Sequence, residues 1–360
     1  MTSSHFSRPP SLIEHTVEVL RTAILQGSWV ERLPGERDLS ELLQVSRPTL
    51  RAALTTLERE GWLAVRQGLQ RSILRKPLES GSRSPQVIGF LSSVPLQETV
   101  PQAQAWMDRL RVILAREGYE IEVHCGRRWY GRTPERELAA LTHEAPAAAW
   151  VLFVSSEEMQ RWFETRGIPA VVSGSVHPGI QLPSVDSDHR ATCRHAAGRF
   201  VALGHRTLVF FRPGPPSAGD LESERGLRDG IKDVPDAVLW VAEHEGSPEG
   251  IRRAVTKILR RSPAPTAFLT ARAHEVLCVA SELIRRGVRI PQDASVMCRD
   301  SDHFLHYFSP QIARYSADPR MHAQRLAKLV LRVARQGAGL LPQVRFLPRF
   351  SPGESLGPVS

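Results

Sequence analysis

The sequence predicts a small α+β domain at the N-terminus, followed by a much larger α/β body made of two subdomains. Three observations lead to this division. The first 75 residues contain three amphipathic segments and then a hairpin pattern. Residues 76–86 are rich in Pro, Gly and Ser and lack a periodic apolar pattern, which is typical of a linker. From residue 87 onward, short apolar runs alternate with amphipathic segments, which predicts parallel sheets covered by helices on both faces.

The N-terminal segment is predicted to contain three helices, because its apolar residues recur at three- and four-residue spacing and so share a face. These residues are Ile13, Val17, Leu20 and Ile24 in the first helix, Leu39, Leu42 and Leu43 in the second, and Leu50, Leu54 and Leu57 in the third. The stretch WLAVRQGLQRSIL follows and predicts two short strands around a turn at Gly68. Three helices and a hairpin form a winged helix-turn-helix.

The body is predicted to alternate strands and helices along most of its length. The strands are expected at 87–93, 121–125, 148–156, 168–174, 207–211, 237–244, 266–270 and 294–298, and the helices at 101–118, 134–142, 157–167, 189–203, 220–232, 248–261, 273–286 and 320–336. This alternation is too long for one compact sheet, so two similar subdomains are expected.

The third N-terminal helix has a basic face at its start. Arg47 and Arg51 are four residues apart and share a face, with Thr49 between them. Ser46 precedes them as a helix N-cap. A helix N-terminus attracts phosphate, and arginine can pair with both guanine acceptors or with a phosphate. Because helix-turn-helix proteins present such a helix end to the major groove, this pattern predicts DNA binding.

The string LPGERDLSELLQVSRPTLRAALTTLEREGWLAVRQG, residues 33–68, closely resembles the winged helix of GntR-type bacterial transcriptional regulators. It contains the family's Leu-Pro, Glu-Arg-Asp-Leu, Val-Ser-Arg, Arg-x-Ala-Leu and Glu-Gly elements. The resemblance implies DNA contacts by Arg37, Ser46, Arg47, Thr49, Arg51 and the wing tip Gly68. The wing departs from the family pattern, since it reads Gly-Leu-Gln-Arg where Gly-x-Gly-Thr is usual. Arg66 and Arg71 flank this turn, where they could reach backbone phosphate or the minor groove.

The body resembles the ligand-binding core of LacI/GalR-type repressors, which are related to periplasmic sugar-binding proteins. The resemblance is carried by SVDSDHRATCRHAAGRFVALGHRTLVFF and by IPQDASVMCRDSD, and most specifically by Gly204-His205-Arg206. The complete prediction is a winged helix-turn-helix domain at 1–75, a linker at 76–86, an α/β two-subdomain periplasmic-binding-protein-like domain at 87–350, and a tail at 351–360. The resemblance implies that the body dimerises and binds its ligand in a cleft between its subdomains.

The family's ligand-binding residues are only partly present. Leu227 occupies the position of the family's sugar-binding arginine, with Arg225 nearby. Arg272 replaces the family's asparagine, and Asp300 matches the first acid of a family loop whose second acid is Ser301 here. The candidate effector-binding residues are therefore Arg225, Arg272 and Asp300. An anionic ligand such as a sugar acid or phosphate, a neutral sugar, and a pocket that has lost its ligand all remain open.

Composition narrows the function class further. The net charge of +9 and the pI of about 10.0 favour a polyanionic partner. The four cysteines form no C-x-x-C pair, and no apolar run is long enough for a membrane span. The N-terminus lacks an apolar signal core. No nucleophile elbow, His-Glu-x-x-His or P-loop is present, and His303 and His306 lack further ligands. We therefore expect a cytoplasmic protein that is not an enzyme, without catalytic residues, metal or cofactor.

These features together predict a repressor-type transcriptional regulator that binds double-stranded operator DNA through the winged helix. A single winged helix reads few base pairs, so a homodimer on a roughly palindromic site is expected. The effector is expected to be a small molecule, either a sugar or an anionic sugar derivative. Two alternatives stand beside this prediction. One is a constitutive dimeric DNA-binding protein whose body no longer binds a ligand, and the other is an enzyme built on the α/β body.

Overall fold

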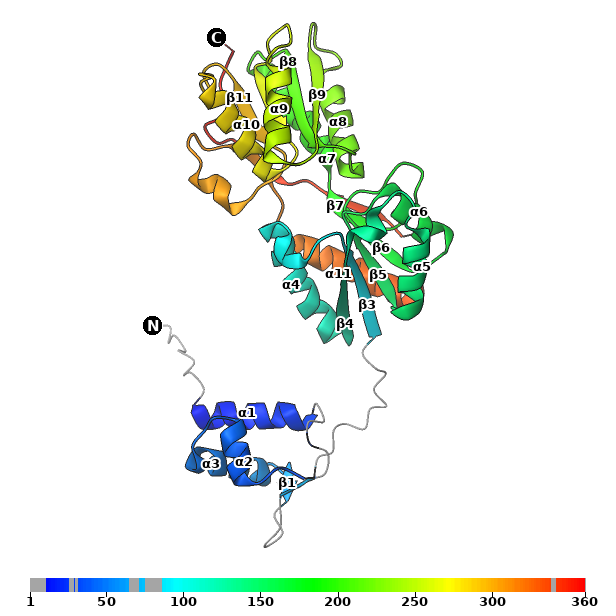
Figure 1. Cartoon of the computed structure of the whole chain (residues 1–360), viewed down its shortest axis with the longest axis vertical. Helices are drawn as coiled ribbons and strands as arrows, with labels where there is room; N and C mark the ends of the chain where they lie inside the picture. The colour runs from blue at the N-terminus through cyan, green and yellow to red at the C-terminus, as the bar shows by residue number, and fades with distance from the viewer. Residues whose placement is uncertain are drawn as a thin grey trace, which may run out of the picture. The chain divides into compact units, whose positions relative to one another are not determined.

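The structure is a computed structural model that describes residues 11–25, 29, 32–64, 71–74, 86–337 and 341–359. The chain divides into two compact units, Met1–Pro85 and Gln86–Ser360 (Figure 1). In the described part of the chain, no helix is both long enough and apolar enough to cross a membrane.

The small unit has the three helices and the hairpin that the sequence predicts. Its elements are α1 (Leu12–Leu25), α2 (Glu36–Leu42), α3 (Arg47–Arg59), β1 (Leu63–Ala64) and β2 (Ser72–Ile73). The two strands pair antiparallel, with Leu63 opposite Ile73. The predicted turn at Gly68 lies outside the described residues, as does most of the predicted linker.

The core of the small unit is built from the predicted apolar stripes, with two exceptions. Leu20, Leu50 and Leu54 are completely buried. Ile13 is 39% exposed because it lies in the first turn of α1, before the buried residues of that helix begin. Leu42 is 65% exposed, because it is the last residue of α2 and the core contacts there are made by Leu39 and Leu43. Ile13 and Leu42 thus lie on the predicted helices but outside the core.

The first subdomain of the large unit contains a six-stranded parallel sheet in the order β13-β7-β6-β5-β3-β4. Helices α4 and α11 pack on one face of this sheet, and α5 and α6 pack on the other. Its strands are β3 (Gln86–Ser92), β4 (Tyr119–Cys125), β5 (Ala149–Phe153), β6 (Ala170–Ser173), β7 (Ser184–Ser187) and β13 (Gln343–Phe346). Its helices are α4 (Pro101–Arg116), α5 (Glu135–Glu144), α6 (Glu157–Thr165) and α11 (Pro319–Gln336).

The second subdomain contains another six-stranded sheet, in the order β14-β12-β11-β10-β8-β9, which is parallel except for the edge strand β14. Helices α9 and α10 cover one face, and α7 and α8 cover the other (Figure 1). Its strands are β8 (Thr207–Pro213), β9 (Val238–His244), β10 (Ala267–Thr270), β11 (Ser295–Cys298), β12 (Ala313–Ser316) and β14 (Arg349–Ser351). Its helices are α7 (His189–Ala202), α8 (Ala218–Ile231), α9 (Pro248–Ile258) and α10 (Ala273–Arg285).

The chain passes between the two subdomains three times. It leaves the first sheet after β7, returns after β12 to form α11 and β13, and leaves again to form β14. Strands β7, β12, β13 and β14 were not predicted, because they are short and do not stand out as apolar runs. All the other strands and helices of the large unit lie within a few residues of their predicted positions.

Residues 351–359 do not form the separate tail that the sequence predicted. Ser355 is completely buried, and its hydroxyl donates to the Val296 carbonyl at 2.6 Å. The Gly357 carbonyl accepts a hydrogen bond from the buried imidazole of His205 or the hydroxyl of Ser295, at 3.1 Å in each case. The end of the chain is therefore built into the second subdomain, and the Gly-His-Arg motif holds it there.

Candidate functional site

The start of α3 is capped as its sequence predicts. The Ser46 hydroxyl accepts a hydrogen bond from the Thr49 backbone N–H at 3.3 Å, and Pro48 lies in the first turn. The hydroxyls of Ser46 and Thr49 are 2.7 Å apart. Leu50, Leu54 and Leu57 anchor the opposite face in the core. The helix N-terminus is thus fixed with its polar residues directed outward.

Replacing Ser46 by alanine should lower the free energy of unfolding of the small unit by about 1 kcal/mol, since this is the usual cost of losing an N-cap. Urea denaturation followed by circular dichroism measures the change. A Ser46→Thr variant keeps the accepting hydroxyl and should stay close to the wild type. Equal losses in the two variants would contradict the capping role.

The arginines predicted to contact DNA differ in whether a carboxylate pairs with them. Arg47 is exposed, and no ion pair to it is found among the described residues. Arg37 is 77% exposed and lies 3.4 Å from Glu41. The Arg51 guanidinium donates to the Glu36 carboxylate at 2.7 Å. Arg47, Arg37 and Arg51 therefore remain available on the surface, with Arg51 already ordered by a carboxylate.

Arg71 is more enclosed than a wing residue was expected to be. Its side chain is 22% exposed and forms ion pairs with Glu36, at 2.9 Å, and with Glu58. Hydrogen bonds from Arg51 and Arg71 outweigh partial burial and lower the pKa of the Glu36 carboxyl. Arg71 thus ties the hairpin to α2 and α3, while its predicted phosphate contact remains a prediction. Arg66 and Gly68 lie outside the described residues.

The large unit has a cavity of about 430 Å³ between its two subdomains. It lies at the carboxyl ends of the parallel strands, the usual place for a ligand in open α/β sheets. Trp106, Phe153, Tyr315 and Phe346 give it apolar surfaces. Its polar surfaces include Ser173, Ser175, Asp186, His189, Arg272, His274, Asp300 and His322. A cavity that combines aromatic rings with a few polar groups suits a small organic ligand.

Asp220 is the centre of a buried ion-pair cluster beside this cavity. Its carboxylate accepts hydrogen bonds from Arg272 at 3.0 and 3.1 Å and from Arg299 at 2.9 Å. The Ser217 hydroxyl donates to the same carboxylate at 2.8 Å, within a capping box at the start of α8. Burial by itself would raise the pKa of the Asp220 carboxyl, but the two guanidinium groups hold it far below its ordinary value.

The three predicted effector-binding residues lie in different places. Arg272 and Asp300 both line the cavity, and the Asp300 carboxylate is 3.4 Å from the Arg299 guanidinium. Arg225 does not line it. Its side chain is 50% exposed and pairs with Glu222 at 2.7 Å on the outer part of α8. The prediction that Arg225 faces the cavity is therefore corrected, because the inward position on this helix is held by Leu227, which is 1% exposed.

Asp186, on the other wall of the cavity, is held ionised. Its carboxylate accepts a hydrogen bond from the Ser175 hydroxyl at 2.6 Å and lies 3.3 Å from the His189 imidazole. Burial raises the pKa of the Asp186 carboxyl, but the charge and hydrogen bond of His189, then the Ser175 hydroxyl and the Ser187 backbone N–H, lower it to about 2. Asp186 thus brings a negative charge to the cavity wall at neutral pH.

Replacing Asp186 by asparagine should make stability less dependent on pH. A carboxyl whose folded-state pKa lies below its ordinary value stabilises the fold above the ordinary value and loses that effect as the pH falls. With a pKa of about 2, the contribution is about 2 kcal/mol at neutral pH and disappears between pH 4 and 2. Urea unfolding of the wild type and the variant from pH 7 to 3 measures how the difference between their free energies of unfolding narrows. Asp108→Asn, at an exposed site on α4, is the control and should leave the curve unchanged.

His322, at the start of α11, extends the same wall. Its Nε2 is 3.1 Å from the Ser173 hydroxyl, and its ring packs on Trp106 with 4.8 Å between the centroids. Burial lowers the pKa of His322 to about 4, so the ring is neutral at physiological pH. Within the part of the chain that the structure describes, no three His, Cys, Asp or Glu side chains are grouped as metal ligands.

Sequence reasoning missed most of the residues that shape the cavity. Asp220, Arg299 and His322 come together from α8, the end of β11 and α11. The spacing along the chain does not predict these pairs, because 79 residues separate Asp220 from Arg299. In the sequence, Asp186 is simply part of a motif that begins a helix. A polar residue at the carboxyl end of a strand was the one signal that could have located Asp186.

Comparisons with known proteins agree with this division. Residues 12–82 match the family model described as bacterial regulatory proteins, gntR family, and residues 197–356 match the model of a periplasmic binding protein-like domain. The chain joins a gntR-family domain to a periplasmic binding protein-like domain. The predicted fold class and both family resemblances are thereby confirmed.

Curated relatives match less than half of this chain. The HTH-type transcriptional repressor PurR of Salmonella paratyphi B is 31% identical over 158 residues, which is 41% of this chain and 45% of that protein. PurR of Salmonella heidelberg gives the same figures. The chain therefore spans less than half the length of the curated relatives that it matches.

Solved structures share the fold at low sequence identity. A LacI family transcriptional regulator from Enterococcus faecium with bound ribose has a TM-score of 0.62 at 18% identity, and the match covers 76% of this chain and all of that one. The transcriptional regulator CelR in complex with cellobiose has a TM-score of 0.66 at 16% identity, with 90% of this chain and 100% of that chain covered. The periplasmic binding protein-like domain is thus LacI-like in fold.

Proposed function

We propose that this chain is a DNA-binding transcriptional regulator whose large unit binds a small effector. One observation carries the proposal: the same chain contains both kinds of site. The small unit has a capped helix with exposed arginines at its start, and the large unit has a cavity between its two subdomains, at the carboxyl ends of the strands. In this proposal Arg47 and Arg51 contact operator DNA, with Ser46, Thr49 and Arg37 positioning the helix. The cavity responds to a ligand that favours one arrangement of the two subdomains.

The charges around the cavity favour a neutral effector over an anionic one. Arg272 is engaged by both oxygens of Asp220, and Arg299 shares that carboxylate. The cavity lining also includes Glu98, Asp186, Asp300 and Asp318, so its carboxylates outnumber its two arginines. The aromatic rings offer apolar faces to a ring-shaped ligand, and the carboxylates can accept hydrogen bonds from hydroxyl groups. We therefore infer a neutral, polyhydroxylated ligand such as a sugar.

Calorimetry of the full chain tests the effector class directly. The panel contains the neutral sugars ribose and cellobiose, which two structural neighbours bind, together with further neutral monosaccharides, sugar acids and sugar phosphates. Binding of a neutral sugar that weakens in an Asp300→Asn variant supports the inference. Binding of anionic sugars alone would overturn the neutral class. Failure of the entire panel would favour a constitutive DNA-binding protein.

We propose further that the protein acts as a homodimeric repressor on a roughly palindromic operator. A winged helix alone contacts only a few base pairs, so specific binding requires two half-sites. Selecting bound duplexes from a random pool tests this proposal, with and without the sugar panel. A two-fold symmetric consensus with protection of both half-sites supports it, whereas an asymmetric single site would contradict it. Transcription from a promoter that overlaps the selected site tests repression.

A further inference from the structure

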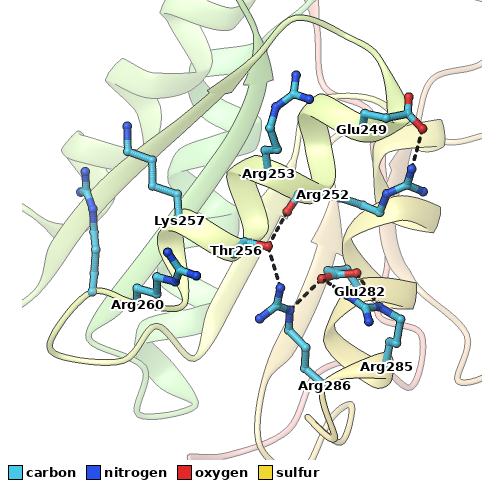
Figure 2. A pocket seen from close by; sticks show the side chains of 10 residues that line it. Glu249, Arg252, Arg253, Thr256, Lys257, Arg260, Glu282, Arg285 and Arg286 are labelled. Atoms are coloured by element: carbon cyan, nitrogen blue, oxygen red, sulfur yellow. Dashed lines mark hydrogen bonds and ion pairs between the residues drawn. The ribbon is translucent and has the colours of Figure 1, made fainter.

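A basic groove lies on the outer face of the second subdomain, between α9 and α10. Its volume is about 710 Å³, and seven of the ten residues that line it are Lys or Arg. Figure 2 shows Arg253, Lys257 and Arg260 extending from the α9 segment, while Arg285 and Arg286 come from the end of α10. This groove shares no lining residue with the cavity at the carboxyl ends of the strands.

The acidic residues nearby neutralise only part of this charge. Glu282 pairs with Arg285 at 2.8 Å and with Arg286 at 2.7 Å. Glu249 pairs with Arg252 at 2.5 Å, and Glu245, which lies beside the lining, pairs with Arg253. Among the residues that the structure describes, Lys257 and Arg260 have no ion pair, and both are exposed. The lining carries seven positive charges against two negative ones, and Glu245 supplies a third negative charge from beside it.

The pattern exceeds what helix ends ordinarily require. One or two cations near a helix C-terminus are favoured by the helix dipole. Here Arg253 and Lys257 are four residues apart on α9, and Arg260 lies in the turn just after the helix, so like charges lie near one another and repel. Glu249 and Glu245 relieve this repulsion at Arg252 and Arg253, but no carboxylate among the described residues pairs with Lys257 or Arg260. The remaining unpaired positive charge in this groove points to an anion that the protein itself does not supply.

Part of the groove is already ordered for an anion. The Arg286 guanidinium donates to Glu282 at 2.7 Å and to the Thr256 hydroxyl at 2.6 Å (Figure 2). Hydrogen bonds from Arg285 and then Arg286 lower the pKa of Glu282 to about 2, so this anchor stays charged. The Nη1 group of Arg286 makes no hydrogen bond within the part of the chain that the structure describes. Fixed guanidinium groups with free N–H donors suit phosphate oxygens.

We propose that this groove binds a small molecule that carries several phosphate groups, such as a nucleoside polyphosphate or inorganic polyphosphate. One helical turn, about 6 Å, separates Arg253 from Lys257, so a single phosphate reaches only part of the cluster. The groove is lined by ten residues, whereas a protein partner needs a much broader surface. The site goes beyond the proposed function, because it adds a second ligand away from the effector cavity.

Calorimetry with inorganic tripolyphosphate on the full chain tests the proposal, at low and at moderate salt. Lys257→Glu/Arg260→Glu removes two cations that have no internal partner, so the fold should be retained. We expect this variant to weaken binding tenfold or more. Arg116→Glu/Arg136→Glu carries the same change in net charge on exposed parts of α4 and α5, and should bind like the wild type. An Arg47→Ala/Arg51→Ala variant should also retain binding, which separates the groove from the DNA-binding helix.

Several outcomes would overturn the proposal. These are no binding by the wild type, equal binding by the groove variant, or an equal loss in the Arg116→Glu/Arg136→Glu control. Poly-glutamate serves as a further arm, and if it binds as tightly as tripolyphosphate, the groove is a docking site for an acidic protein segment instead. Comparing tripolyphosphate with ATP then distinguishes an inorganic from a nucleotide source of the phosphates.

Discussion

Replacing Asp220 by alanine should lower the free energy of unfolding of the large unit by about 3–5 kcal/mol. The substitution leaves Arg299, which is 4% exposed, and the partly enclosed Arg272 without their shared carboxylate. A buried charge that loses its partner is much more costly than a missing surface ion pair. Urea denaturation monitored by tryptophan fluorescence measures the change, because the large unit contains most of the tryptophans.

Two further variants separate the buried charges from other effects at this position. Asp229→Ala, on the same helix, removes a carboxylate that pairs with the exposed Arg190 and should have a much smaller effect. Combining Asp220→Ala with Arg272→Met and Arg299→Met should restore much of the stability, because no unpaired charge is then left buried. If Asp220→Ala alone proved no worse than Asp229→Ala, the cluster would not stabilise the fold as argued.

The cluster also determines how the cavity presents its charge. Asp220 holds Arg272 through both oxygens, so the arginine that the sequence offered as an anion receptor is already satisfied. Its 23% exposed side chain still reaches the cavity, where it can donate to a neutral hydroxyl group. The sequence left an anionic and a neutral ligand both open, and this pairing, together with the carboxylates of the lining, supports the neutral one.

The elements of the fold were predictable because each produces a local pattern. Residues 207–211 form a continuous apolar run and became β8, and the helical spacing of Leu50, Leu54 and Leu57 placed them in the core. Strand β13 pairs with β7 across more than 150 residues and includes the exposed Gln343 and Arg345. Its position depends on tertiary pairing, which local hydrophobicity does not report.

The DNA-binding helix and the cavity differed in how well the sequence predicted them. Residues at the start of α3 act together because they are neighbours in the sequence, so the N-cap at Ser46 could be assigned directly. The cavity is assembled from segments that are distant in the sequence. An error of one or two positions in the comparison therefore assigns ligand binding to the wrong residue. Arg225 and Leu227 differ by two residues, or about 200° around a helix. This difference places one side chain on the surface and the other in the core.

Replacing Arg47 or Arg51 by alanine should weaken operator binding by roughly tenfold to a hundredfold, which corresponds to about 1–3 kcal/mol for each arginine that contacts a base. Both side chains are exposed on the first two turns of α3, where no carboxylate of the helix competes with DNA. If Arg51 must leave Glu36 on binding, this costs a small amount of free energy, so Glu36→Gln should strengthen binding modestly. Fluorescence anisotropy with a duplex selected from a random pool measures these affinities.

The control and the salt dependence distinguish base reading from phosphate binding. Arg59→Ala removes an exposed arginine at the far end of the same helix and should leave affinity nearly unchanged. Arg47→Lys and Arg51→Lys keep the charge but lose the two-pronged guanidinium. If the arginines read guanine, these lysine variants should bind selected and unselected duplexes more equally. If they bind phosphate, the lysine variants should retain affinity, and each alanine variant should reduce the salt slope by about 1. Wild-type affinity in both alanine variants would remove α3 from the operator contact altogether.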